Sequence, residues 1–285
     1  MAPSTRQLLS QFKALADPVR ARIVLLCIVT ECSVSELTRV TGLSQPRVSQ
    51  HLKQLIASGL LERFRDGHFV YYRVPQLSGE ALTRRLLALL PADEPAFAGD
   101  LEKLRSLRPV EETGRSAAFV DDRSLHKALV ELTVSAPLGN LLDIGCGEGR
   151  LLKLLASRAK RVVGVDIDQQ ARRLARAELL LAGLPNCSLR QGDMLSLPFA
   201  DGEFDTVIMD DVLSEASEPT AAVNEAKRLL GEGGRLLFLA SVGPRAVGRI
   251  AEDFAHWAAA TGLRLAAPRP IPERNPSWLL GIATL

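Results

Sequence analysis

The sequence predicts an α/β protein made of two different parts, and three observations support this prediction. The first 90 residues hold short helical patterns, a glycine turn and two short alternating runs. From Asn140 onward, short apolar runs alternate with helical patterns, which is typical of a parallel sheet with crossover helices. The length of 285 residues suits two domains. We therefore place a small domain at 1–90, a linker at 91–120 and a larger domain at 121–285.

Composition excludes several classes of protein. Apolar residues make up 47% and charged residues 24% of the chain, as in folded globular proteins and unlike disordered ones. No run of 18 apolar residues occurs and the first residues lack a signal-type apolar core, so we expect no membrane span and a cytoplasmic location. The four cysteines, Cys27, Cys32, Cys146 and Cys187, form no Cys-x-x-Cys pair. We expect them to be reduced and to act as small hydrophobic residues.

The charge is distributed unevenly between the two parts. Residues 1–90 carry 12 Lys and Arg against six Asp and Glu, a net charge of +6, whereas residues 91–285 carry 23 against 27, a net charge of −4. A basic small domain suggests a polyanionic partner, although a solvated basic face is the simpler alternative.

The small domain is predicted to be a winged helix-turn-helix. Helical patterns cover 5–16 and 18–30, and Asp17 with Pro18 caps the second of them. Two short helices then flank Gly42, whose freedom at positive φ suits the tight turn of a helix-turn-helix. Asp66-Gly67 lies between two alternating runs, which predicts a hairpin, the wing.

The outer face of the second helix and the tip of the wing carry hydrogen-bonding and basic side chains. Such groups suit base edges in the major groove and the phosphates beside it. The alternative is a solvated polar face on a protein-binding module. The residues predicted to contact DNA are Ser44, Gln45, Arg47, Ser49, Gln50, His51, Lys53, Arg65 and His68.

Residues 7–75 resemble the ArsR/SmtB family of bacterial repressors. The matching stretches run from Phe12 to Arg20, Val34 to Leu37, Leu43 to Leu52 and Gly67 to Arg73. The resemblance implies a homodimer formed by the first helix and the helix after the wing, and binding to a palindromic double-stranded operator, usually as a repressor.

One departure from this family concerns metal sensing. Its arsenic and cadmium sensors carry a Cys-Val-Cys run where this chain has Ser33-Val34-Ser35, and serine is a poor ligand for soft metals. The other metal site of the family uses His and acidic residues in the last helix, where 77–90 contains Glu80 and no His. We therefore expect no metal, although sensing through Cys27 and Cys32 stays a weaker alternative.

The linker is expected to be structured. Proline and glycine flank a helical piece at 101–107, and a further helix is predicted at 121–134.

The large domain carries a glycine-rich turn and acids at the ends of its strands. The first strand, 141–144, runs into Gly145-x-Gly147-x-Gly149, and such turns let a backbone approach a nucleotide beside the start of a helix. Asp166 ends the second strand and Asp193 follows the third, where they are placed to accept from ribose hydroxyls and an adenine amino group. Ordinary loop capping is the alternative for both acids.

This domain resembles the class I S-adenosylmethionine-dependent methyltransferases over about 120–285. The stretches that carry the resemblance are 142–149, 164–168, 191–199, 204–209 and 229–236. It implies a Rossmann-like seven-stranded methyltransferase fold and a site for S-adenosylmethionine (SAM) or its product S-adenosylhomocysteine (SAH). The expected cofactor-binding residues are Asp143, Gly145, Cys146, Gly147, Gly149, Asp166, Ile167, Asp193, Met194 and Asp210.

The sequence does not identify a catalytic residue. Methyl transfer from SAM needs mainly proximity and alignment, with a base only when the acceptor must lose a proton. Asp210, Asp211 and Glu215 are candidate bases, but they could equally hold the cofactor or line the cleft. Our leading hypothesis is a transcriptional regulator that senses SAM or SAH. The alternative is an active methyltransferase with a DNA-binding or dimerising appendage.

Overall fold

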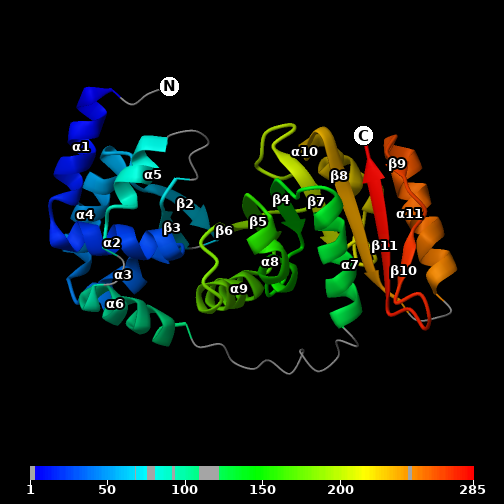
Figure 1. Cartoon of the computed structure of the whole chain (residues 1–285), viewed down its shortest axis with the longest axis horizontal. Coiled ribbons are helices and arrows are strands. Elements are labelled where there is room, and N and C mark those ends of the chain that lie inside the picture. The colour runs from blue at the N-terminus through cyan, green and yellow to red at the C-terminus, as the bar shows by residue number, and fades with distance from the viewer. Residues whose placement is uncertain (1–3, 68, 76–80, 92–93, 109–121, 243–245) are drawn as a thin grey trace. The chain divides into compact units, whose positions relative to one another are not determined.

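The fold comes from a computed structural model, which describes residues 4–67, 69–75, 81–91, 94–108, 122–242 and 246–285. The chain divides into two compact units, Met1–Val110 with Leu179–Pro185 and Glu111–Glu178 with Asn186–Leu285. Each is described by itself below (Figure 1). The domain boundaries predicted at residues 90 and 120 stay predictions, and residue 120 lies outside the described residues.

The first unit is a winged helix-turn-helix, as the sequence predicts. Asp17 accepts a hydrogen bond from Arg20 N at 2.9 Å and Pro18 opens the second helix, so the predicted cap is present. Gly42 ends the third helix at φ 71° and makes the turn to the fourth. The helices are α1 Thr5–Leu15, α2 Pro18–Val29, α3 Val34–Thr41, α4 Gln45–Ala57, α5 Ala81–Leu87 and α6 Pro95–Ser106.

The wing is a sheet of three strands instead of the predicted two. Strands β2 Glu62–Asp66 and β3 Phe69–Arg73 form the expected hairpin, with Asp66 opposite Phe69. A two-residue strand, β1 Cys32–Ser33, pairs with the other edge of β3, with Cys32 opposite Tyr72. The start of α3 and the wing therefore share one hydrogen-bonded edge.

Helix α6 covers residues 101–106 of the helical piece predicted at 101–107 and extends toward the N-terminus to Pro95, with Leu107 as its C-cap. Phe97 and Leu104 of α6 are 5% and 0% exposed and belong to the same apolar core as Ile23 of α2 and Leu37 of α3. Part of the predicted linker is thus an integral layer of the first unit.

The second unit has the parallel α/β sheet that the sequence predicts. Its strands are β4 Asn140–Ile144, β5 Arg161–Asp166, β6 Cys187–Gln191, β7 Phe204–Asp210, β8 Leu230–Ser241, β9 Arg264–Leu265, β10 Arg269–Ile271 and β11 Trp278–Thr284. Seven of them follow the order β10-β11-β8-β7-β4-β5-β6, and the short β9 pairs with β11 (Figure 1). β11 is antiparallel to β8, whereas β8 to β6 are parallel.

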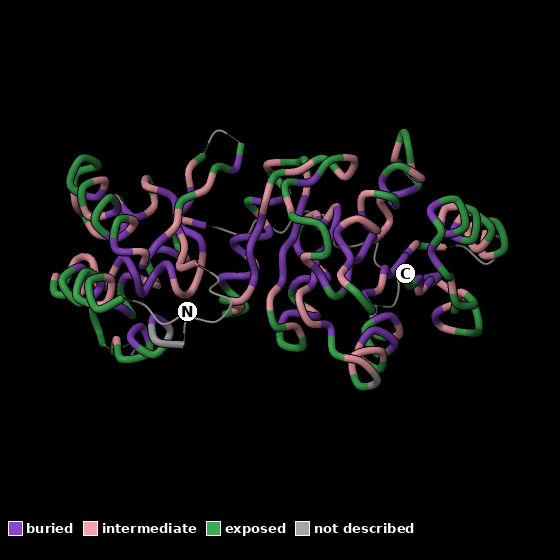
Figure 2. Tube along the Cα trace, turned by 90° about the horizontal axis from the view of Figure 1, so that it is seen from above, coloured by how far each residue is buried: buried purple, intermediate pink, exposed green. Residues whose placement is uncertain are grey.

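Helices and the buried strands make the core of the second unit. The helices are α7 Asp122–Ser135, α8 Arg150–Leu155, α9 Gln169–Leu181, α10 Pro219–Leu229 and α11 Val247–Thr261, with a short 3-10 turn at Ala156–Arg158. Figure 2 shows the strands buried and the outer turns of the helices exposed. In the part of the chain that the structure describes, no helix has the length and apolar character needed to span a bilayer.

The glycine-rich stretch at 231–234 forms a bulge. It lies inside β8, between the pairs Phe204–Leu230 and Thr206–Arg235. The four residues bulge opposite a single residue of β7, and Gly233 at φ 72° supplies the left-handed conformation.

Candidate DNA interface and ligand cleft

Helix α4 presents one polar and one buried face, as the helix-turn-helix prediction requires. Val48, Leu52 and Leu55 are buried at 0–1% exposure. Among the predicted DNA contacts on this element, Ser44, Gln45, Arg47, Gln50 and Lys53 are exposed and Ser49 is half-buried. The sequence period thus brings these donors and acceptors together on the solvent side.

Of the other three predicted DNA contacts, the structure describes His51 and Arg65. His51 is half-buried, and its Nδ1 lies 3.9 Å from a carboxylate oxygen of Asp17, so the structure directs this ring toward the start of α2 and not toward the exposed face. Arg65 is exposed on β2 beside the wing turn. His68 lies outside the described residues.

The glycine turn after β4 takes the left-handed backbone that only glycine adopts easily. Gly145, Gly147 and Gly149 have φ of 76°, 51° and 81°. A Cβ on Gly145 would lie 2.1 Å from Val212 Cγ1, but a Cβ on Gly147 would meet no atom within 4 Å. The turn is therefore packed at its first glycine and open at its middle one.

Asp166 fixes this turn. Its carboxylate accepts hydrogen bonds from Gly147 N and Asp168 N, both at 2.8 Å. Gly145 N also donates to Val165 O at 2.7 Å. Each carboxylate oxygen keeps a further lone pair, so Asp166 can anchor the loop and still accept from a ligand at the carboxyl end of β5.

A buried acid lies behind the same turn. Asp143 of β4 is 1% exposed, and its Oδ1 has no hydrogen-bond partner. Burial and the Asp210 charge raise the pKa of Asp143 well above its usual value, although the Arg150 charge opposes them and Asp166 adds to them. The surroundings of Asp143 thus favour its protonated form more than water does.

Arg150, at the start of α8, contacts residues of two strands, Asp210 of β7 and Trp278 of β11. Its Nη2 donates to Asp210 Oδ2 at 2.6 Å, and its guanidinium lies 4.8 Å from the ring centroid of Trp278. This charged pair lies at the carboxyl ends of β4 and β7, where open parallel sheets bind their ligands. Sequence reasoning overlooked Arg150, although an arginine directly after a glycine turn was a usable signal.

The remaining predicted cleft residues differ in their exposure. Ile167 is 69% exposed, Asp193 is exposed and Met194 is half-buried. Asp193 Oδ1 accepts from Leu195 N at 3.0 Å, so part of its role is loop capping. Cys146 is 7% exposed, with its Sγ directed toward Gly164 in the interior, so its backbone is the part available to a ligand.

Two of the three candidate bases have structural roles. Asp210 pairs with Arg150, and Asp211 accepts from Ser241 N at 2.7 Å. Asp211 also has φ 57°, a strained conformation for an L-residue. Glu215 is exposed.

The Cys27 and Cys32 thiols are both buried in the first unit. A hydrogen bond with Cys32 and burial raise the pKa of Cys27 well above its usual value, which disfavours the thiolate that soft metals bind. Among the described residues, no group of three or more His, Cys, Asp or Glu is placed to hold a metal ion.

Comparisons with known proteins agree with both halves of this description. Residues 17–63 match the family model of bacterial regulatory proteins of the arsR family, and residues 142–238 match a methyltransferase domain. An arsenic resistance transcriptional regulator of Pseudomonas putida is 37% identical over 97 residues, which cover 34% of this chain and 76% of that protein.

The second half has its own relatives. An arsenite methyltransferase of Aquipseudomonas alcaligenes is 35% identical over 108 residues, 34% of this chain. The match covers only 31% of that methyltransferase. A solved SAM-dependent methyltransferase of Clostridium acetobutylicum has a TM-score of 0.51 at 15% identity, covering 60% of this chain and 94% of that one. This last likeness shows the fold.

The fold and the two matches define a protein in which a winged-helix DNA-binding domain is joined to a methyltransferase domain. By its N-terminal half, the chain belongs to the arsR family of bacterial regulatory proteins.

Proposed function

We propose that this chain is a transcriptional repressor that binds operator DNA as a homodimer and senses SAM or SAH through its methyltransferase domain. DNA binding follows from the arsR family. The exposed polar face of α4, with Arg47 and Gln50, would read the major groove. Arg65 on the wing would contact a neighbouring phosphate.

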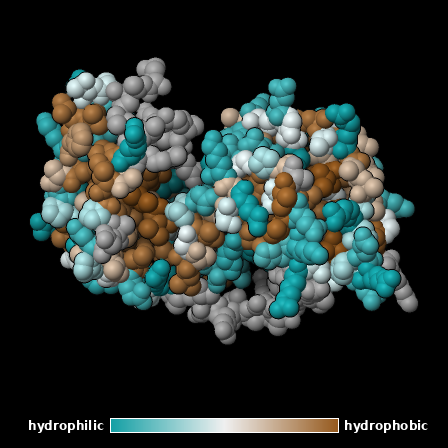
Figure 3. Space-filling view, viewed as in Figure 1, coloured by the Kyte–Doolittle hydropathy of each residue, from teal (hydrophilic) through white to brown (hydrophobic). Residues whose placement is uncertain are grey.

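The apolar face of α1 supports the homodimer. Leu9 and Phe12 are 54% and 49% exposed, and apolar side chains gather over this part of the first unit in Figure 3. Gln11, at 0% exposure, donates to Thr83 Oγ1 of α5 at 3.2 Å, so α1 and α5 hold each other within one protomer. A second copy that covers Leu9 and Phe12 across a two-fold axis would remove this apolar surface from water.

The cleft fits an adenosyl amino acid. Open space above Gly147 admits a ligand close to the backbone, and Asp166 is placed to accept from ribose hydroxyls. The Asp143 carboxyl is buried with one oxygen that lacks a hydrogen-bond partner, and we infer that the cationic end of the ligand would satisfy it. SAM supplies an activated methyl group when bound, whereas SAH fills the same contacts without one.

The contacts of the two acids at the end of β7 favour sensing over catalysis. Asp210 is paired with Arg150, and Asp211 holds the end of β8 through Ser241 N. These two carboxylates are therefore committed to the fold of the cleft, which favours ligand binding without proton abstraction from an acceptor.

The test is a titration of the operator with and without each metabolite. A duplex selected from random DNA by the protein serves as operator, and fluorescence anisotropy gives its affinity at several salt concentrations. A tenfold change on saturation with SAM or SAH corresponds to about 1.4 kcal/mol of coupling between the sites. Equal affinity with and without both metabolites at every salt concentration overturns the sensor proposal.

The second candidate function is methyl transfer. The relative named arsenite methyltransferase favours it, because this chain is 35% identical to it over 108 residues. Transfer of a labelled methyl group from SAM to any member of a broad acceptor set, trivalent arsenic included, would support it. No transfer to any acceptor would count against it.

A further inference from the structure

Arg108 makes a three-point side-chain clamp in the first unit. Its side chain is 7% exposed, and its guanidinium donates from each of its three nitrogens. Nε donates to Glu36 Oε1 at 2.6 Å, Nη1 to Thr30 Oγ1 at 3.1 Å and Nη2 to Glu31 O at 2.6 Å. Because a guanidinium is planar and rigid, three partners fix its position and orientation.

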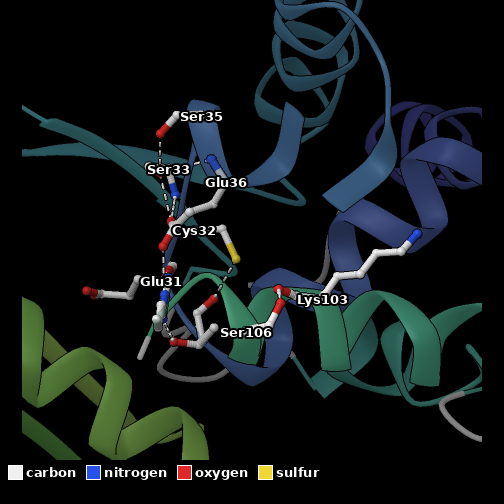
Figure 4. Close-up of polar contacts among 9 residues, drawn as sticks. Glu31, Cys32, Ser33, Ser35, Glu36, Lys103 and Ser106 are labelled. Atoms are coloured by element: carbon white, nitrogen blue, oxygen red, sulfur yellow. Dashed lines mark hydrogen bonds and ion pairs between the residues drawn. The ribbon is translucent and has the colours of Figure 1, made fainter. Parts of the chain in front are cut away.

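The clamp continues into the first turn of α3. Glu36 Oε2 accepts from Ser33 N and Ser33 Oγ, each at 2.7 Å, and Ser33 Oγ accepts from Glu36 N at 3.3 Å. Ser33 and Glu36 thus form a capping box. We call the group formed by Glu31, Ser33, Glu36 and Arg108 the α3 corner. Figure 4 shows Ser33 and Glu36 of this corner in the same view as Lys103 and Ser106 of α6. Burial opposes ionisation of Glu36, but the charge and hydrogen bond of Arg108 lower its pKa below the usual value.

The α3 corner is connected to both elements that we expect to contact DNA, helix α4 and the wing. Helix α3 leads through the Gly42 turn directly into α4, and β1 pairs Ser33 with Tyr71 of β3 in the wing. Glu31 also lies 3.6 Å from Arg73 of β3, measured from Oε1 to Nη1. A shift at this corner therefore reaches α4 and the wing together.

Arg108 also stands at a particular place along the chain. It directly follows α6 and its end residue Leu107, and the next described residue is Asp122, where α7 of the second unit begins. Upstream, α6 is held by a bidentate pair, since Arg22 donates from Nε and Nη2 to Asp100 at 2.6 Å each. Arg108 is thus the last described residue of α6's C-terminal end before the methyltransferase domain, and it is held by the contacts above.

We propose that Arg108 is the positioning residue through which the ligand state of the methyltransferase domain changes the fit of the winged helix to DNA. In this proposal the Arg108–Glu36 contact transmits the ligand state of the methyltransferase domain to the start of α3. The inference rests on the proposed sensing function. The start of α3, which has Ser33 and Ser35 where metal sensors of the family have two cysteines, would then respond to the methyltransferase domain of the same chain.

The test separates Arg108 from Glu36 without leaving a buried charge. In the double variant Arg108→Met, Glu36→Gln, glutamine at this position still completes a capping box, and no carboxylate stays buried opposite a lost cation. The matched control is Arg22→Met, Asp100→Asn, which removes the other ion pair of α6 and leaves the α3 corner intact.

Three full-length proteins are compared by operator affinity, with and without saturating SAH, and by SAH affinity in calorimetry. We expect wild type and control to keep their ratio of operator affinities, and the double variant to lose it to within twofold while SAH binds as before. Hydrogen exchange of the peptide 30–41 should respond to SAH in the wild type and not in the double variant.

The outcomes distinguish the two proposals. A wild-type ratio of one with SAH and with SAM overturns the sensing function, and this inference with it. A normal wild-type ratio that the double variant retains, or that the control loses equally, overturns only the role of Arg108. If thermal unfolding shows that the double variant does not fold, Arg108→Lys replaces it. This variant keeps the charge but not the three-point clamp, and an unchanged ratio there overturns the inference.

Discussion

The middle glycine of the cleft turn allows a test of where the ligand lies. Gly147 has φ 51°, and a Cβ there would meet no atom within 4 Å. Gly147→Ala should cost the fold only the strain of a left-handed alanine, roughly 1–2 kcal/mol. The new methyl group would, however, project into the open space that we assign to SAM or SAH. Overpacking of this kind costs about 1–3 kcal/mol, a roughly 5- to 150-fold loss of affinity.

A matched control separates strain from obstruction. Gly233 has φ 72°, and a Cβ there would also meet no atom within 4 Å. It lies in the bulge of β8 opposite the start of β7, at the amino ends of the parallel strands and not at their carboxyl ends. Gly147→Ala and Gly233→Ala should lower the free energy of unfolding in urea by similar amounts, and only the first should weaken SAH binding in calorimetry. If Gly147→Ala binds SAH as the wild type does, the ligand does not approach this backbone and our assignment of the cleft is wrong.

Three further predictions concern single side chains. Asp166→Asn should weaken SAH binding in calorimetry and leave operator affinity without ligand unchanged, because the amide nitrogen cannot accept from a ribose hydroxyl. Arg47→Ala should do the reverse, with a loss of about 1–3 kcal/mol in operator binding by anisotropy. Since the pKa of Asp143 is raised in the folded state, its contribution to stability is complete at acidic pH and lost as pH rises through that pKa. Asp143→Asn should therefore stabilise the protein more at pH 8 than at pH 5 in urea unfolding, and an equal effect at both would contradict the burial argument.

Local signals in the sequence predicted most of the fold. The Asp17-Pro18 cap, the Gly42 turn and the Asp66-Gly67 hairpin each depend on a few neighbouring residues, and each is present. The strand-end acids were predictable for a similar reason, because the carboxyl ends of parallel strands meet at one edge of the sheet.

Long-range pairing explains what the sequence could not reveal. Strand β1 is only two residues long and depends on the pairing of Cys32 with Tyr72, which is distant in the sequence. Glu36, the carboxylate partner of Arg108, is separated from it by 72 residues. Asp100 did carry a signal, since it lies three residues after Phe97 on the apolar side of α6, and a charge there implies a buried partner such as Arg22.

Ser33 ends a strand and begins a helix within a single residue. Its backbone pairs with Tyr71 and its hydroxyl caps α3, so both elements meet at this residue. In a screen for loss of the proposed repression, alleles at the Ser33 codon would affect α3 and the wing together, whereas alleles in β2 or α4 would each affect one DNA-contacting element first. Suppressors of such alleles would be expected in either element.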